Sequence, residues 1–226
     1  IYGTGGHESK KETDLIEPLT AYSRSKILTE EEVKNINLES MVFTSLRFAT
    51  ACGWSNRLRL DLVLNDFVAC AVSSRNIIVQ SDGTPWRPLI DVQDMSRAIV
   101  WAINREISNG GGYLVVNTGC NENNFQIKDI AMEVSKQLND IKISINKNAI
   151  PDKRSYSVDF SLFKKLAPNH QPKISLKESI KRLIIGFELI NFDDKNFQNS
   201  KLIRLNVIKD HISSKRLGQN LRWLNK

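Results

Sequence analysis

The sequence has 226 residues, of which 41% are hydrophobic and 25% charged, and its formal net charge is +7. This composition is typical of an ordinary folded protein, and no apolar run approaches the roughly 20 residues of a membrane helix. The three cysteines and three histidines are scattered, so they predict no metal site and no disulfide framework, and a sparse, odd cysteine set is typical of the cytoplasm.

The first half of the chain alternates helical and extended patterns. Pro18 and Thr20 are start signals for a helix predicted over residues 21–33. A run rich in β-branched and aromatic residues predicts a strand over 41–49. Apolar residues at helical spacing predict a helix over 60–74, followed by a short strand over 77–79 and a turn at 82–84.

The alternation continues in the second half. A strand over 87–92 leads into a helix over 93–105, with Asp94 in its first turn, where a carboxylate suits the helix dipole. The remaining predicted elements are strands over 113–116 and 141–145 and helices over 127–138, 161–166 and 175–187. Strands that alternate with helices predict an α/β fold.

The charge lies almost entirely in the last 32 residues. Residues 195–226 hold eight basic residues and one acidic residue, a net charge of +7, so the remaining 24 basic and 24 acidic residues cancel. The basic residues alternate with apolar ones, and a helical pair with a solvated basic face explains this more simply than a nucleic-acid groove. We therefore expect neither a nucleic acid nor a membrane as partner.

Tyr22 and Lys26 form the sharpest local chemical motif. Four residues apart on a helix, the phenol and the ammonium project from one face. A nearby cation favours the phenolate form of a tyrosine, which can then take a proton from a hydroxyl group. The spacing alone is also compatible with an exposed Tyr and Lys on a surface helix.

The surrounding segments resemble the extended short-chain dehydrogenase/reductase family. Residues 18–26 (PLTAYSRSK) are similar to its P-x-S/T-x-Y-x-x-S-K signature, and residues 1–3 (IYG) to the strand end that precedes it. Residues 46–53 (LRFATACG) resemble its L-R-x-x-N/T-x-x-G segment, and residues 83–94 (GTPWRPLIDVQD) its G-x-x-x-R-x-x-I-H-V-x-D segment. The resemblance covers essentially the whole chain and is strongest to NAD-dependent nucleotide-sugar epimerases and dehydratases.

The resemblance implies a fold and two domains. It implies a Rossmann-type parallel sheet that lacks its N-terminal strands, plus a smaller C-terminal α/β substrate-binding lobe. Residues 1–160 would form the Rossmann-type part, interleaved with substrate-binding segments, and residues 161–226 the helical part of the lobe. The sequence begins with Ile1 rather than Met and has no G-x-x-G-x-x-G turn. We therefore expect a fragment whose sheet has an uncovered edge, and which is inactive and poorly soluble by itself.

The resemblance also implies roles for particular residues. Tyr22 would be the catalytic acid and base, and Lys26 would assist it and hydrogen-bond the nicotinamide ribose. Phe48 would lie where the chain passes the nicotinamide of NAD or NADP. Substrate contacts are implied for Thr50, Asn65, Arg87, Asp152 and Arg154.

Each of these substrate positions also has a plain structural interpretation. Asn65 could cap a helix or face solvent, Arg87 could be a surface charge, and Thr50 is an ordinary strand residue. Asp152 and Arg154 flank a turn marked by Pro151. A role borrowed for Asp91 is in doubt, because the family pattern has His there.

The resemblance implies NAD-dependent epimerisation of a nucleotide sugar, of the UDP-hexose 4-epimerase type, through a transient 4-keto intermediate. A nucleotide-sugar 4,6-dehydratase or 4-ketoreductase is the first alternative, and a non-catalytic sugar-nucleotide or partner-binding module is the second. A cytoplasmic homodimer is expected for the full-length protein.

Overall fold

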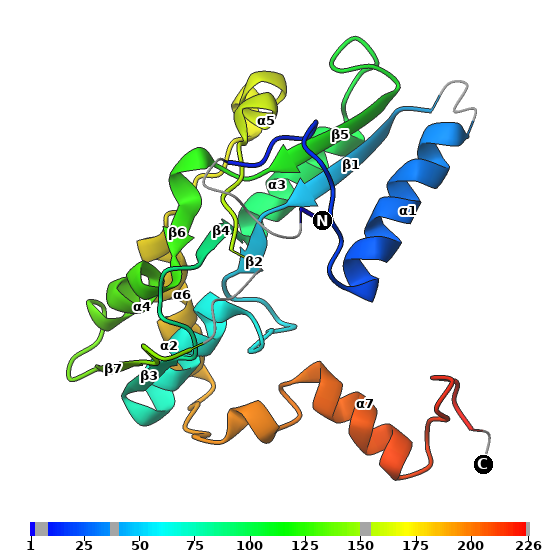
Figure 1. Ribbon diagram of the computed structural model, residues 1–226. Coiled ribbons are helices and arrows are strands. Elements are labelled where there is room, and N and C mark those ends of the chain that lie inside the picture. Colours follow the sequence, from blue (N-terminus) through cyan, green and yellow to red (C-terminus); the bar gives the residue numbers. More distant parts are fainter. Residues whose placement is uncertain (3–8, 37–40, 150–154, 225–226) are drawn as a thin grey trace.

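The computed structural model describes residues 1–2, 9–36, 41–149 and 155–224. It confirms an α/β fold built on parallel strand pairs. Strand β1 (Phe43–Phe48) pairs in parallel with β5 (Tyr113–Thr118), in a register that joins Phe43 to Tyr113 and Phe48 to Thr118. Figure 1 shows these two strands side by side, with helix α1 (Ala21–Asn35) along one flank.

Two further sheets are present, one of three strands and one of two. β2 (Thr50–Cys52) pairs in parallel with β4 (Trp86–Asp91), which also pairs antiparallel with β6 (Asn124–Gln126). β3 (Asn76–Val79) pairs in parallel with β7 (Lys142–Ile145). β2 and β6 were not predicted from the sequence, because strands of three residues are too short to show a two-residue period.

The helices lie close to their predicted positions. α3 (Val92–Ile103), α4 (Ile127–Ser135), α5 (Ser161–Leu166) and α6 (Leu176–Leu189) follow the order expected from the sequence. Two helices are three residues shorter than predicted: α4 ends at Ser135 instead of 138, and α2 (Val63–Ser74) starts late. Helix α2 begins three residues later than predicted, because the fully buried Leu60 belongs to the turns before the helix.

The largest hydrophobic core joins α2, α4 and α6. Leu64 and Val68 of α2, Ile130 of α4 and Leu183 of α6 are completely buried in it. Helix α6 therefore packs onto elements that precede residue 160, and the division of the chain at that residue stays a prediction. A second core lies where α3 and α5 pack near β5, through Trp101, Phe163 and Val116.

The C-terminal residues form a separate feature. Helix α7 (Arg204–Ser213) buries none of its side chains and lies apart from the other labelled helices in Figure 1. In the part of the chain that the structure describes, no helix combines the length and the apolar character needed to cross a bilayer.

Candidate functional site

The predicted catalytic residues lie at the start of α1, which a reciprocal cap fixes. The Thr20 hydroxyl accepts a hydrogen bond from the Ser23 amide at 3.1 Å, and the Ser23 hydroxyl accepts one from the Thr20 amide at 3.0 Å. This capping box satisfies two backbone donors that a helix end otherwise leaves free. It places Tyr22 within the first turn of the helix.

Tyr22 and Lys26 project together into solvent. The Lys26 Nζ lies 5.3 Å from the centroid of the Tyr22 ring, and 74% of Tyr22 is exposed. The Tyr22 backbone carbonyl accepts a hydrogen bond from the Ser25 hydroxyl at 2.8 Å, while the exposed side chain leaves its phenol group open to a ligand. A phenol beside an ammonium can exchange protons with a bound hydroxyl group.

The segment that follows β2 comes close to Tyr22. Arg59 in this segment forms a two-pronged ion pair with Asp61, at 2.6 and 2.7 Å. The hydrogen-bonded carboxylate of Asp61 raises the pKa of Arg59, and Tyr22 lies near enough to add to the same shift. Arg59 therefore lies within electrostatic range of Tyr22 on α1.

A buried ion pair anchors α1 to β1. The Glu30 carboxylate accepts hydrogen bonds from Arg47 Nη2 at 2.6 Å, Arg47 Nε at 3.0 Å and the Ser45 hydroxyl at 2.9 Å. The side chains of Arg47 and Glu30 are only 8% and 10% exposed. Since Glu30 and Ser23 are the only buried residues in α1, a polar contact rather than an apolar stripe orients this helix. No pattern in the sequence pointed to Glu30.

The same arginine connects the anchor to the sheet. Arg47 Nη1 donates to the Tyr2 hydroxyl at 3.0 Å, and that hydroxyl donates to Asn117 Oδ1 on β5 at 2.5 Å. Burial raises the pKa of Tyr2, so its phenol stays neutral and can serve both contacts. Burial works to lower the pKa of Arg47, but its bonds to Glu30 and Tyr2 outweigh burial and the net change is a rise.

Phe48 and Thr50 lie on either side of the break between β1 and β2. Phe48 is the last residue of β1 and pairs with Thr118, while Thr50 opens β2 and pairs with Leu89. Both side chains are half-buried. Ligands of open α/β sheets bind at the carboxyl ends of parallel strands, so Phe48 lies at a suitable edge, whereas Thr50 lies at the amino end of its strand.

Arg87 lies on β4 beside the segment that follows residues 150–154. Its guanidinium is 5.9 Å from the centroid of the Tyr156 ring and donates to the Trp86 carbonyl at 2.8 Å. The Ser155 hydroxyl accepts a hydrogen bond from the Trp86 amide at 3.0 Å. The predicted site residues Asp152 and Arg154 lie outside the described residues.

The Asn65 side chain is buried and forms its hydrogen bonds within the protein. It is 2% exposed, its Oδ1 accepts from the Gly53 amide at 3.0 Å, and its Nδ2 donates to the Arg59 carbonyl at 3.0 Å. Asn65 is therefore neither a helix cap nor a solvent-facing residue. Its amide holds the segment between Gly53 and Arg59, so any effect on a substrate would act through that segment.

Asp91 and Asp94 are also structural in this fold. Asp91, which stands where the family pattern has His, is the N-cap of α3 and accepts from the Gln93 amide at 2.9 Å. Asp94, expected only as a helix-start residue, is 1% exposed and accepts from the backbone amides of Lys173 and Ile174. It joins α3 to the segment before α6, which its position in the sequence could not reveal.

Gly53 allows a close approach between the end of β2 and Asp91. Its φ is +100°, and a Cβ at this position would lie 2.4 Å from Asp91 Oδ2. We expect Gly53→Ala to destabilise the protein by about 2–4 kcal/mol, through backbone strain and overpacking. Gly111→Ala is the matched control, because Gly111 has a φ of +85° and its nearest neighbour is 4.0 Å away. Urea unfolding of both variants tests this, and equal losses would show that the Asp91 contact has no effect.

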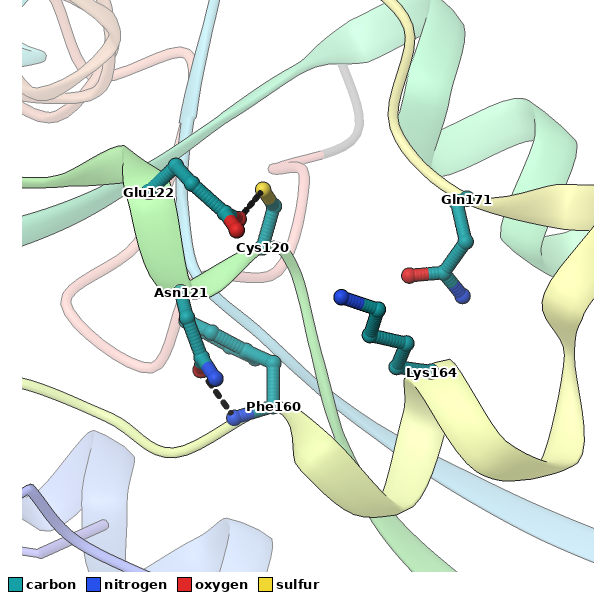
Figure 2. A pocket seen from close by; sticks show the side chains of 6 residues that line it. All are labelled: Cys120, Asn121, Glu122, Phe160, Lys164 and Gln171. Carbon is teal, nitrogen blue, oxygen red and sulfur yellow. Dashed lines mark hydrogen bonds between the residues drawn. The ribbon is translucent and has the colours of Figure 1, made fainter.

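A cavity lies just after the end of β5, and its lining includes none of the predicted site residues that the structure describes. Its volume is about 180 Å³. Figure 2 shows its lining of Cys120, Asn121, Glu122, Phe160, Lys164 and Gln171. The Cys120 thiol donates to Glu122 Oε2 at 2.5 Å, and burial with this bond raises the pKa of Cys120 to about 11. A protonated thiol is a poor nucleophile, so we place the candidate chemistry at Tyr22 and Lys26 instead.

The parallel α/β fold with an exposed Tyr–Lys pair defines a Rossmann-like class of protein. The sequence profile of the NAD dependent epimerase/dehydratase family matches residues 1–119, which is just over half of the chain. The chain therefore belongs to this family. No three or more His, Cys, Asp or Glu side chains among the described residues are grouped to hold a metal ion.

Similar proteins of known sequence or structure agree with the family. A Methanocaldococcus jannaschii protein provisionally named UDP-glucose 4-epimerase is 26% identical over 192 residues, which span 81% of this chain and 58% of its own length. The UDP-glucose 4-epimerase from Bifidobacterium longum in complex with NAD⁺ and UDP matches with a TM-score of 0.71 and 17% identity, over 85% of this chain and 62% of that one. The NAD-dependent NDP-hexosamine 5,6-dehydratase TunA, of tunicamycin biosynthesis, matches with the same score and identity, over 86% and 62%.

These structural matches are matches of fold, and they include both epimerases and a dehydratase. The chain spans about three-fifths of the length of the relatives that it matches. The particular reaction, substrate and partners of the whole protein are therefore matters for proposal.

Proposed function

We propose that the full-length protein is an NAD-dependent nucleotide-sugar epimerase of the UDP-hexose 4-epimerase type. The observation that carries this proposal is the exposed Tyr22–Lys26 pair on the capped helix α1, within the residues that match the family. The name of the Methanocaldococcus jannaschii relative supports an epimerase of UDP-glucose.

The donor groups at the start of α1 fit one end of NAD. Both the phenol of Tyr22 and the ammonium of Lys26 are exposed, and both can hydrogen-bond ribose hydroxyls. NAD, when bound, would supply a hydride acceptor and donor. Phe48, at the carboxyl end of β1, would lie beside the nicotinamide. The sequence has no glycine-rich phosphate turn, so we assign none of its residues to the pyrophosphate.

Tyr22 would move the proton in both halves of the reaction. As a phenolate it would accept the proton of a sugar hydroxyl while the adjacent carbon loses a hydride. It would return the proton to the oxygen when the resulting ketone is reduced on its opposite face. Lys26 would hold the phenolate through its positive charge, at the distance that the helical turn between them fixes.

The substrate would bind along the edge where β1, β2 and β4 meet. Arg87 would grip the diphosphate, because a planar guanidinium matches phosphate oxygens in a two-pronged geometry. Thr50 would contact the same group from β2, and Asn65 would contribute by holding the segment after Gly53. Asp152 and Arg154 would close over the nucleotide.

Product analysis tests the proposed reaction. The full-length protein, with NAD and UDP-glucose, should give UDP-galactose, which has the same mass and a different chromatographic mobility. The second candidate is a dehydratase, which the likeness to TunA favours; its product would be lighter by one water. No conversion of any nucleotide sugar, with binding retained, would favour a non-catalytic module.

A homodimer and a cytoplasmic location are also proposed for the full-length protein. Light scattering tests the homodimer, and cell fractionation tests the location.

A further inference from the structure

The C-terminal arm, which we define as residues 201–224, carries both the excess charge and a set of exposed apolar side chains. Residues 201–224 hold six basic residues and one acidic residue, a net charge of +5 out of the +7 of the whole chain. On the arm, Leu205 is 57% exposed, Leu221 60%, Trp223 67% and Leu224 51%. Exposed apolar groups beside an unbalanced charge usually mark a binding surface.

Helix α7 places its apolar residues on one face and its basic residues beside that face. Leu205, Ile208 and Ile212 recur at spacings of three and four residues, so they share one face of α7. Arg204 and Lys209 lie on the two borders of this face. Lysine and arginine at such borders can keep their charges in water while the apolar face is buried.

The segment after α7 folds back and joins it in one unit. The ring of Trp223 contacts the edge of His211, with centroids 5.1 Å apart, and Leu217 and Trp223 form an isolated bridge. Arg216 forms an ion pair with Asp210 at 2.7 Å. These contacts hold Trp223 near α7 instead of leaving it on a loose end.

From this arrangement we infer, against the expectation from the sequence that no membrane is a partner, that the C-terminal arm docks on a membrane surface rich in anionic lipids. A basic helix with an apolar face lies in the interface of such a bilayer, with its charges among the headgroups. An exposed tryptophan suits the same depth. This inference does not depend on the proposed enzymatic function.

Two other occupants fit the arm less well. A second copy of the chain offers no excess of acidic residues, because everything before residue 195 is neutral overall. A nucleic acid would pair with the basic residues but would leave Leu205 and Ile208 exposed to water, since phosphates make no use of aliphatic side chains.

Sedimentation with vesicles tests the inference on the full-length protein. We expect binding to vesicles of equal parts phosphatidylserine and phosphatidylcholine, and none to vesicles of phosphatidylcholine alone. Binding should weaken as salt rises from about 0.1 M to about 1 M, because the Debye length falls from about 10 Å to about 3 Å. The emission of Trp223 should shift to the blue on binding; the shift should vanish in Trp223→Phe and persist in Trp86→Phe.

Paired variants separate charge from apolar insertion. Arg204→Gln/Lys209→Gln should weaken the binding by about 30-fold, and Leu205→Ser/Ile208→Ser by about tenfold or more. Lys177→Gln/Lys181→Gln is the matched control, since these exposed lysines lie on α6, and its binding should be unchanged. Absence of binding to the anionic vesicles would overturn the inference. Full binding by Leu205→Ser/Ile208→Ser, or displacement from vesicles by a single-stranded oligonucleotide that binds more tightly, would do the same.

Discussion

Tyr22→Phe is expected to lower the turnover number of the full-length enzyme by about 10²–10⁴-fold, with little change in its affinity for the nucleotide sugar. The substitution removes only the hydroxyl group that exchanges the proton, and general acid–base groups contribute this much to catalysis. Tyr22 is exposed and makes no described side-chain hydrogen bond within the protein, so the fold should be unaffected. Steady-state kinetics with UDP-glucose, at saturating NAD, measures the effect.

Two lysine variants complete this test. Lys26→Met should also reduce the turnover number, because it removes the cation 5.3 Å from the Tyr22 ring. Lys34→Met is the matched control, since Lys34 is an exposed lysine in the last turn of the same helix. Normal turnover by Tyr22→Phe would contradict the proposed mechanism and leave the family assignment intact.

Glu30→Ala is expected to destabilise the protein by about 3–5 kcal/mol. Without its partner, the Arg47 guanidinium remains a buried charge that keeps only its contacts with Tyr2 and the Glu12 carbonyl. Because Glu30 is one of two buried residues in α1, the loss should also loosen the helix that carries Tyr22 and Lys26. Urea unfolding measures the stability, and amide hydrogen exchange along α1 measures the loosening.

A double variant distinguishes the ion pair from general damage to the helix. Glu30→Leu/Arg47→Met replaces both charges by apolar groups and should recover part of the stability, as buried pairs often do on such replacement. Glu31→Gln, an exposed neighbour on α1, should change the stability by no more than about 0.5 kcal/mol. If Glu30→Ala changed the stability as little as Glu31→Gln, α1 would not depend on this anchor.

Much of the fold could be predicted because its elements carry local signals. Helix α1 begins after Thr20, and α6 begins after Ser175, since each side chain accepts a hydrogen bond from an amide in the first turn. The turn at 82–84 likewise forms around the Asp82 carboxylate, which accepts from the Thr84 amide. Where the signal is short, as in β2 and β6, the prediction failed.

The candidate site also contains features that local sequence patterns predict and features that depend on distant partners. The spacing of Tyr22 and Lys26 on one helix turn is a property of the sequence, and so is the basic, apolar pattern of the last 32 residues. Asn65 and Asp94 are buried, and each forms hydrogen bonds with backbone groups of another segment. These partners lie 6 to 80 residues away in the sequence, so local patterns could not reveal them.

Local patterns in the sequence are enough to predict the α/β class, the resemblance to the family and the Tyr22–Lys26 pair as the candidate for proton transfer. How the helix that carries this pair is held, through Glu30 and Arg47, 17 residues apart, appears only in the folded protein. The physical reason is that a helix spacing is fixed by local backbone geometry. A buried ion pair exists only where packing removes both charges from water and brings them together.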